Sequence, residues 1–235
     1  MNKKIIILFI SILCMNCLAE PDEVVKIIEK LNQAANNLKN LSAEIEYIHA
    51  QPLFDTQTIR TGKLFYTKDA NTGALRINFL TLKQDQSKQQ NYREDYIFDG
   101  MKLTKIDYQS KSATTERLSE NKPIDPFELV QNYFPIIGLA KPHEMTQQFD
   151  ITVNGEFLKM IPKENSKFFK TYKEVNLKIN PDNYLPSVFS AITCDDEQIT
   201  IKLSRVNTSR AVEKKVFESN IPADFTQSQK DAVRD

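Results

Sequence analysis

The 235-residue sequence has little glycine, no tryptophan, three cysteines, two histidines and no excess of charge of either sign. Its five glycines are too widely spaced for a phosphate-binding loop, which needs several glycines within one short motif. Lysine plus arginine and aspartate plus glutamate number 31 each, so no net positive charge attracts a nucleic-acid backbone. These absences argue against nucleotide enzymes and against nucleic-acid binding.

Residues suited to catalysis or metal binding are equally sparse. A serine or cysteine nucleophile usually needs a base beside it, and only His49 and His143 are available as histidine bases. The His143-Glu144 pair lacks the second histidine of a zinc-protease helix, because that position is Gln147. The acidic run 195–197 lacks the mid-loop glycine of a calcium loop and fits a hairpin turn. We therefore expect no enzyme activity, metal or cofactor; a lipid- or cell-wall-acting enzyme with paired carboxylates stays open as the least favoured alternative.

The N-terminus has the pattern of a secretory signal peptide. Two lysines precede the apolar run 5–14, and Cys17-Leu18-Ala19 places small residues where a signal peptidase cleaves. We predict a signal peptide over residues 1–19, export to the periplasm, and one domain over residues 20–235. Lipidation at Cys17 is the alternative, disfavoured by the Met15-Asn16 that precedes it. Cleavage leaves Cys194 alone, which excludes an intramolecular disulfide; we expect it to be half-buried.

Hydrophobic periodicity predicts one helix followed by many strands. Apolar residues recur at helical spacing between Val24 and Leu38, and Asp22 can cap the helix start. From Leu41 onward the period changes to two, which is typical of strands with one apolar face. The Asp99-Gly100 dipeptide between two alternating runs predicts a hairpin. We predict a mainly β (α+β) fold with about ten or eleven strands in an antiparallel meander; the later strands are expected at 149–153, 157–161, 172–179, 185–193 and 198–203.

The alternation stops between Leu118 and Phe149, where two helical segments are predicted. Asp125 and Pro126 have the residue types of a cap and a first helical position, and Pro135 ends this helix. A second, shorter helix is expected over 142–148. The apolar residues of the first segment can form either a movable lid over a cavity or a permanently packed core; they are Phe127, Val130, Tyr133, Phe134, Ile136 and Ile137.

The order of these elements resembles the LolA-type periplasmic lipoprotein carriers (LolA/LolB-like). The resemblance is carried by the initial helix, Leu41-Ser42-Ala43, Gly62–Tyr66, the Phe98-Asp99-Gly100 hairpin, the apolar insertion and the ending Ile221–Phe225. It implies a single unclosed antiparallel half-barrel with helices over its concave face and an apolar lipid-binding cavity between them. The implied cavity residues, besides those of the insertion, are Leu64, Tyr66, Ile77, Phe79, Tyr96 and Phe98.

The resemblance also implies a function. The expected ligand is an acylated lipoprotein or lipid, which a monomeric carrier takes from an inner-membrane donor to an outer-membrane acceptor. A basic residue followed by proline assists transfer in the family, and the matching positions here are Lys68-Asp69. The alternative is a sensor or interaction module on the same fold that binds lipoproteins or a membrane regulator.

Overall fold

The computed structural model describes residues 21–69, 73–120, 122–124, 126 and 142–230. Its elements are α1 (Pro21–Asn37), β1 (Asn40–Gln51), η1 (Pro52–Phe54), β2 (Thr56–Lys68), β3 (Gly73–Gln84), β4 (Gln90–Phe98), β5 (Lys102–Asp107), β6 (Ser112–Arg117), α3 (Pro142–Gln148), β7 (Phe149–Asn154), β8 (Phe157–Pro162), β9 (Tyr172–Ile179), β10 (Pro186–Thr193), β11 (Gln198–Asn207), η2 (Lys214–Phe217) and β12 (Thr226–Lys230).

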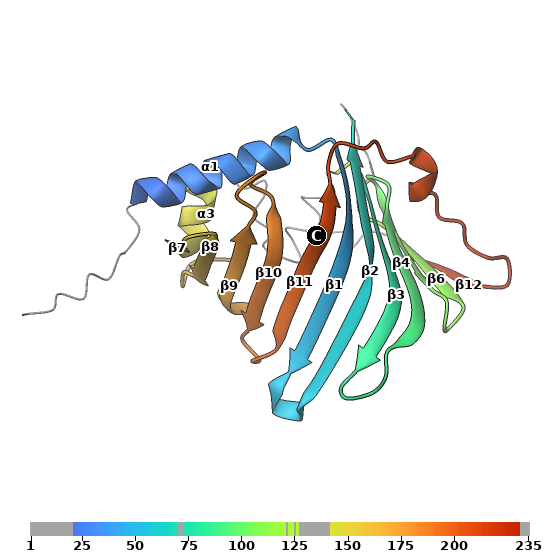
Figure 1. Cartoon of the computed structure of the whole chain (residues 1–235). Coiled ribbons are helices and arrows are strands. Elements are labelled where there is room, and N and C mark those ends of the chain that lie inside the picture. The colour runs from blue at the N-terminus through green and yellow to red at the C-terminus, as the bar shows by residue number, and fades with distance from the viewer. Residues whose placement is uncertain (1–20, 70–72, 121, 125, 127–141, 231–235) are drawn as a thin grey trace, which may run out of the picture.

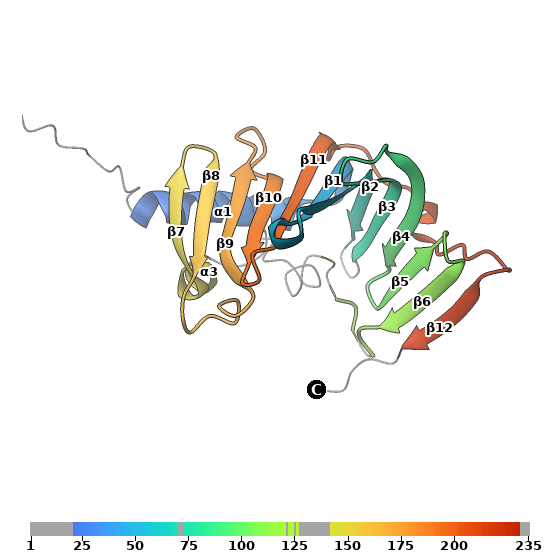
Figure 2. The ribbon, with the colours of Figure 1, turned by 90° about the horizontal axis from the view of Figure 1, so that it is seen from below.

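The strands form one twelve-stranded sheet that does not close into a barrel. Its order is β12-β6-β5-β4-β3-β2-β1-β11-β10-β9-β8-β7, and β7 and β12 lie at opposite ends (Figures 1 and 2). Two antiparallel runs, β1–β6 and β7–β11, therefore join where β1 pairs with β11. The predicted half-barrel with helices on its concave face is confirmed, as are the hairpin at Asp99-Gly100 and the helix over 142–148.

Helix α1 forms because its apolar residues share one stripe. Val24, Ile28 and Leu31 are buried together with Met145 of α3 and with residues of β7–β10 such as Leu158. An amphipathic helix gains most of its stability from burying such a stripe. The larger core cluster therefore lies between α1, α3 and the β7–β10 part of the sheet.

The sheet curves where its pairing is interrupted. Register shifts occur between Ser42 and Glu44, between Thr61 and Gly62, and in β3 after Phe79. Bulges of this kind bend a strand and increase its twist. At Gly62 an added Cβ would collide with the main-chain carbonyl of Asn78, so the β2–β3 bulge has room only for glycine.

The C-terminal segment departs from the predicted meander. Residues 208–225, which we call the C-terminal strap, leave β11 in the middle of the sheet and lead to β12 at its edge (Figure 1). Strand β12 then pairs in parallel with β6. The predicted antiparallel sheet of about ten or eleven strands is confirmed, and β12 adds a parallel strand that was not predicted, because Thr226–Lys230 is polar and exposed throughout and has no alternation to detect.

Candidate functional site: the helix-side face of the sheet

Strand register brings the six predicted cavity residues of the sheet onto one face. Leu64 lies opposite Ile77, which lies opposite Tyr96. Tyr66 and Phe98 lie two positions along their strands from Leu64 and Tyr96, and alternate residues of a strand share a face. Phe79 lies two positions from Ile77. We call these six residues the apolar row: Leu64, Tyr66, Ile77, Phe79, Tyr96 and Phe98.

The apolar row lies on the same face as α1. Tyr47 of β1 pairs with Arg60 on one side and with Ile201 on the other, and Ile201 packs against the core beneath α1. The helix-side face thus has two parts. Beneath α1 and α3 it is a filled core, whereas the apolar row on β2–β4 continues beyond that core.

Burial differs along the row. Tyr66, Phe79 and Phe98 are buried, whereas Leu64, Ile77 and Tyr96 are half-buried. The Phe79 ring packs edge-on against Tyr96 at 6.2 Å between centroids and contacts Tyr47 at the same separation. These residues form a continuous apolar and aromatic surface.

A polar cluster adjoins this surface at Phe79. Glu94 pairs with Phe79 in register and is 1% exposed, yet it is a carboxylate. Its Oε2 accepts a hydrogen bond from Arg60 at 3.1 Å, and its Oε1 lies 2.6 Å from the Lys105 ammonium. A buried carboxylate requires such partners, because unpaired buried charge is strongly unfavourable.

The cluster perturbs the groups around it. Burial is the main cause that raises the pKa of Tyr47 and of Tyr96, so both hydroxyls are neutral at pH 7. Burial acts to lower the pKa of Lys105, but its hydrogen bonds to Glu94 and Tyr96 outweigh this effect and raise that pKa. Sequence reasoning missed Arg60, Glu94 and Lys105. Glu94 could have indicated this cluster, because it lies two residues before Tyr96 in the same strand and therefore points to the same, helix-side face.

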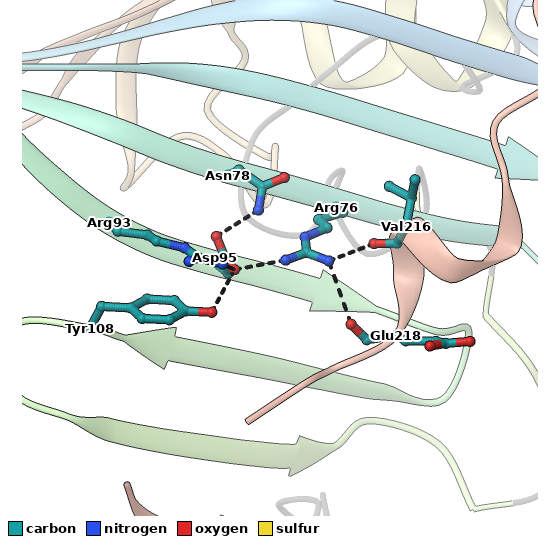
Figure 3. Close-up of polar contacts among 7 residues, drawn as sticks. All are labelled: Arg76, Asn78, Arg93, Asp95, Tyr108, Val216 and Glu218. Carbon is teal, nitrogen blue, oxygen red and sulfur yellow. Dashed lines mark hydrogen bonds and ion pairs between the residues drawn. The ribbon is translucent and has the colours of Figure 1, made fainter. Parts of the chain in front are cut away.

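The opposite face carries a second buried carboxylate, at the next residue. Asp95 is fully buried and accepts hydrogen bonds from Arg76 at 2.7 Å, Asn78 at 2.6 Å and Tyr108 at 3.2 Å (Figure 3). Arg76 also donates to the carbonyls of Val216 and Glu218 in the C-terminal strap. This second cluster fastens the strap to the outside of the sheet.

The remaining predicted residues lie at the margins of the site or outside it. Lys68 ends β2, and its backbone N–H donates to the carbonyl of Lys39. The insertion residues Phe127, Val130, Tyr133, Phe134, Ile136 and Ile137 lie outside the described residues.

Of two further predictions from the sequence, the turn at residues 195–197 is confirmed and the half-buried Cys194 is wrong. Residues 195–197 lie in the β10–β11 connection as expected, and Glu197 accepts hydrogen bonds from Gln51 and pairs with His49 at 3.0 Å. Cys194 is exposed rather than half-buried, because it follows β10 at the start of that turn. Among the described residues, no group of three His, Cys, Asp or Glu side chains could hold a metal ion. The described part of the chain also contains no helix of the length and apolarity needed to cross a membrane.

The fold is an open half-barrel with helices, and comparison with known proteins identifies the family. The sequence model of the family described as outer membrane lipoprotein carrier protein LolA matches residues 86–220, more than half of the chain. The chain belongs to this family. No curated protein matches the sequence.

Solved structures agree on the fold. An uncharacterized conserved protein from Thermus thermophilus is 10% identical with a TM-score of 0.50, over 87% of this chain and 98% of that one. MucB is also 10% identical, with a TM-score of 0.52 over 87% of this chain; the match spans 65% of the MucB chain. The complex of Pseudomonas aeruginosa MucA and MucB is 12% identical with a TM-score of 0.47, covering 84% and 61%. The likenesses to the Thermus thermophilus protein and to MucB alone concern the fold only.

Proposed function

We propose that this protein is a periplasmic carrier that shelters the acyl chains of a lipoprotein or lipid and transfers it towards the outer membrane. Membership in the LolA family supports a lipoprotein ligand. The observation that carries the proposal is the apolar row, which lies beyond the core beneath α1 and contains three half-buried side chains. An inner-membrane donor, an outer-membrane acceptor, a monomeric state and removal of residues 1–19 are parts of the same proposal.

Differential burial is the physical basis of such a carrier. Each methylene group removed from water contributes about 0.8 kcal/mol, so a chain laid along the apolar row gains several kcal/mol without any specific polar contact. The same side chains bury one another when no ligand is present, which lowers the cost of release. The transfer role of Lys68 and the lid role of residues 127–137 rest on the sequence.

Two isoleucines on opposite faces allow a matched test. Ile77 is half-buried in the apolar row, whereas Ile48 is half-buried on the outer face of β1, opposite Ile59. We expect Ile77→Ser to weaken binding of a palmitoylated peptide about tenfold, because it removes one large apolar contact. Ile48→Ser should leave binding unchanged, with equal far-ultraviolet circular dichroism for both variants.

The measurement is fluorescence anisotropy of the labelled peptide with the exported protein, supported by mass spectrometry of organic extracts of the purified protein. Equal binding by wild type and Ile77→Ser would contradict the proposal. Co-purification of a protein partner without any acylated species would favour a sensor or interaction module on this fold.

A further inference from the structure

The polar cluster on the helix-side face has more hydrogen-bond donors than free acceptors. Both oxygens of Glu94 are engaged, one by Arg60 and one by Lys105. Asp107 lies opposite Glu94 in register, but its carboxylate accepts the main-chain N–H groups of Gln109 and Ser110. The acidic groups are therefore occupied within the protein.

The two cations of the cluster share a single carboxylate, because Arg60 and Lys105 both pair with Glu94. The Lys105 ammonium also lies beside Tyr96, whose O–H can donate to an acceptor of a ligand. Two cations with one carboxylate leave a net positive charge, so these groups favour a ligand that supplies anionic acceptor oxygens.

Arg76 on the outer face is held by more contacts than Arg60 is, although the Nε of each is buried without a hydrogen-bond partner in the described residues. Its terminal nitrogens donate to the Asp95 carboxylate and to two main-chain carbonyls of the strap. Arg60 has Glu94 as its acceptor, and its guanidinium otherwise lies over the rings of Phe79 and Tyr92 at 5.9 and 5.5 Å. The two arginines thus share a buried carboxylate partner, but only Arg76 is tied to a further segment of the chain.

The two cationic side chains are partly exposed and adjoin the apolar row. The Arg60 side chain is 29% exposed and that of Lys105 is 45% exposed. The Lys105 ammonium lies 5.5 Å from the ring of Tyr96, which belongs to the apolar row. A chain lying on the row would therefore place a polar end group beside these donors.

We propose that Arg60, Lys105 and Tyr96 bind the anionic headgroup of an amphiphile, a carboxylate or phosphate, whose acyl chain lies on the apolar row. Glu94 holds both cations in position. This inference rests on the proposed function, since the acyl chain uses the surface proposed for lipoprotein acyl groups. It adds a second requirement for ligands, which is an acceptor headgroup at one end.

Two amphiphiles of equal chain length test this requirement. Laurate and dodecyltrimethylammonium are titrated into the full-length protein below their micelle concentrations, with Kd measured by calorimetry. We expect laurate to bind about tenfold more tightly, because hydrogen bonds to a charged group add to the shared apolar contribution. Acetate, which has the headgroup without the chain, should not displace laurate at millimolar concentration.

Tyrosine variants separate headgroup recognition from folding. Tyr96→Phe removes one O–H and keeps the ring. We expect about a threefold to tenfold loss of laurate affinity and no change in the affinity for dodecyltrimethylammonium. Tyr108→Phe is the matched control, because its hydroxyl donates to Asp95 on the outer face. Arg60→Gln should reduce laurate affinity about tenfold, and Arg93→Gln on the outer face should not.

The outcomes are distinguishable. Equal binding of the two amphiphiles, or equal losses for both in Tyr96→Phe, would overturn the headgroup site and leave the carrier proposal standing. Displacement of laurate by acetate would show a site for small anions and would also overturn the inference. Binding of neither amphiphile would overturn both proposals.

Discussion

Glu94 and Asp95 are neighbours in β4 and are both almost completely buried, on opposite faces of the sheet. Each carboxylate is paired with a strongly held arginine and with a second, more exposed cation: Lys105 for Glu94 and Arg93 for Asp95. Buried ion pairs add little net stability, but loss of one partner leaves an uncompensated charge. We infer that these pairs specify the register of β2–β5 more than they stabilise it.

A surface pair gives a residue-scale prediction about pH. Hydrogen bonds from Lys159, at 2.6 Å, and then from Asn176, at 2.8 Å, lower the pKa of Glu174 below its ordinary value. Because the folded pKa is lowered, the associated stability is present above the ordinary glutamate pKa of about 4.3 and is lost as pH falls through the lower folded value. We expect Lys159→Gln to raise the pKa of Glu174, measured by carboxyl ¹³C NMR titration.

Lys202→Gln provides the control for this titration, because Lys202 pairs with Glu46 at 2.7 Å and does not bond to Glu174. It should leave the pKa of Glu174 unchanged. An identical Glu174 titration in wild type and in Lys159→Gln would show that the Lys159 contact does not stabilise the carboxylate.

Residue-scale features were predictable where they depend on alternation alone. The alternation of apolar and polar residues is enough to place Leu64, Ile77 and Tyr96 each on the apolar side of its own strand. The association of Arg60, Glu94 and Lys105 was not predictable, because it depends on the relative register of β2, β4 and β5. Register is set by the whole sheet, including its bulges, and none of these residues is close to another in sequence.

At the scale of elements, the β2–β3 bulge gives a sharp prediction. Gly62 lies against the Asn78 carbonyl, and a methyl group there would force the two strands apart. We expect Gly62→Ala to reduce the free energy of unfolding by about 2 kcal/mol or more, as overpacking in a constrained site does. Urea denaturation of the purified protein measures the change.

Gln57→Ala is the matched control on the same strand, because the Gln57 side chain is exposed and Gln57 bonds to Asp85 through its backbone N–H and carbonyl, which the variant keeps. Its effect should lie within about 0.5 kcal/mol of wild type. If both variants unfold at the same urea concentration, the close approach at Gly62 does not constrain the bulge.

The sequence predicts some elements better than others, because some have a local sequence pattern and others depend on pairing between residues far apart in the chain. Helix α1 and the β4–β5 hairpin have local signals, namely a stripe at helical spacing and an Asp-Gly turn, and both were predicted. Strand β12 has neither, since it is polar and is held by parallel pairing with β6, more than 100 residues earlier. The β1–β11 pairing that joins the two runs of strands is likewise long-range.

At the scale of the whole molecule, the two faces of the sheet are used differently. The helix-side face carries the core beneath α1 and the apolar row, whereas the outer face of β3–β6 is covered by the C-terminal strap. Ile221 and Phe225 of the strap pack against Ile97, Ile106 and Ala113, and the Phe225 ring lies edge-on to Tyr108 at 5.4 Å. The strap thereby protects an apolar part of the outer face from water.

The strap and the sheet meet at Asp95, which gives a prediction for the whole molecule. Asp95→Asn removes the negative charge that orients Arg76, and Arg76 in turn donates to the Val216 carbonyl at 2.6 Å. We expect a loss of about 3 kcal/mol in the free energy of unfolding, because the variant leaves a buried guanidinium without its counter-charge. Hydrogen exchange should increase selectively over residues 214–230, since η2 and β12 lose their anchor before α1 and its core do.

Arg93→Gln separates this anchoring role from a general effect of charge at the site. Arg93 approaches Asp95 at 3.5 Å but is 53% exposed, and exposed ion pairs contribute only about 1 kcal/mol or less. It should therefore change neither stability nor exchange in the strap by a comparable amount. Because the apolar row is on the other face, Asp95→Asn should also retain acyl-peptide affinity at temperatures where it stays folded. An exchange increase spread evenly over α1 and the strap would show that the two faces unfold together, and that Asp95 stabilises the sheet as a whole.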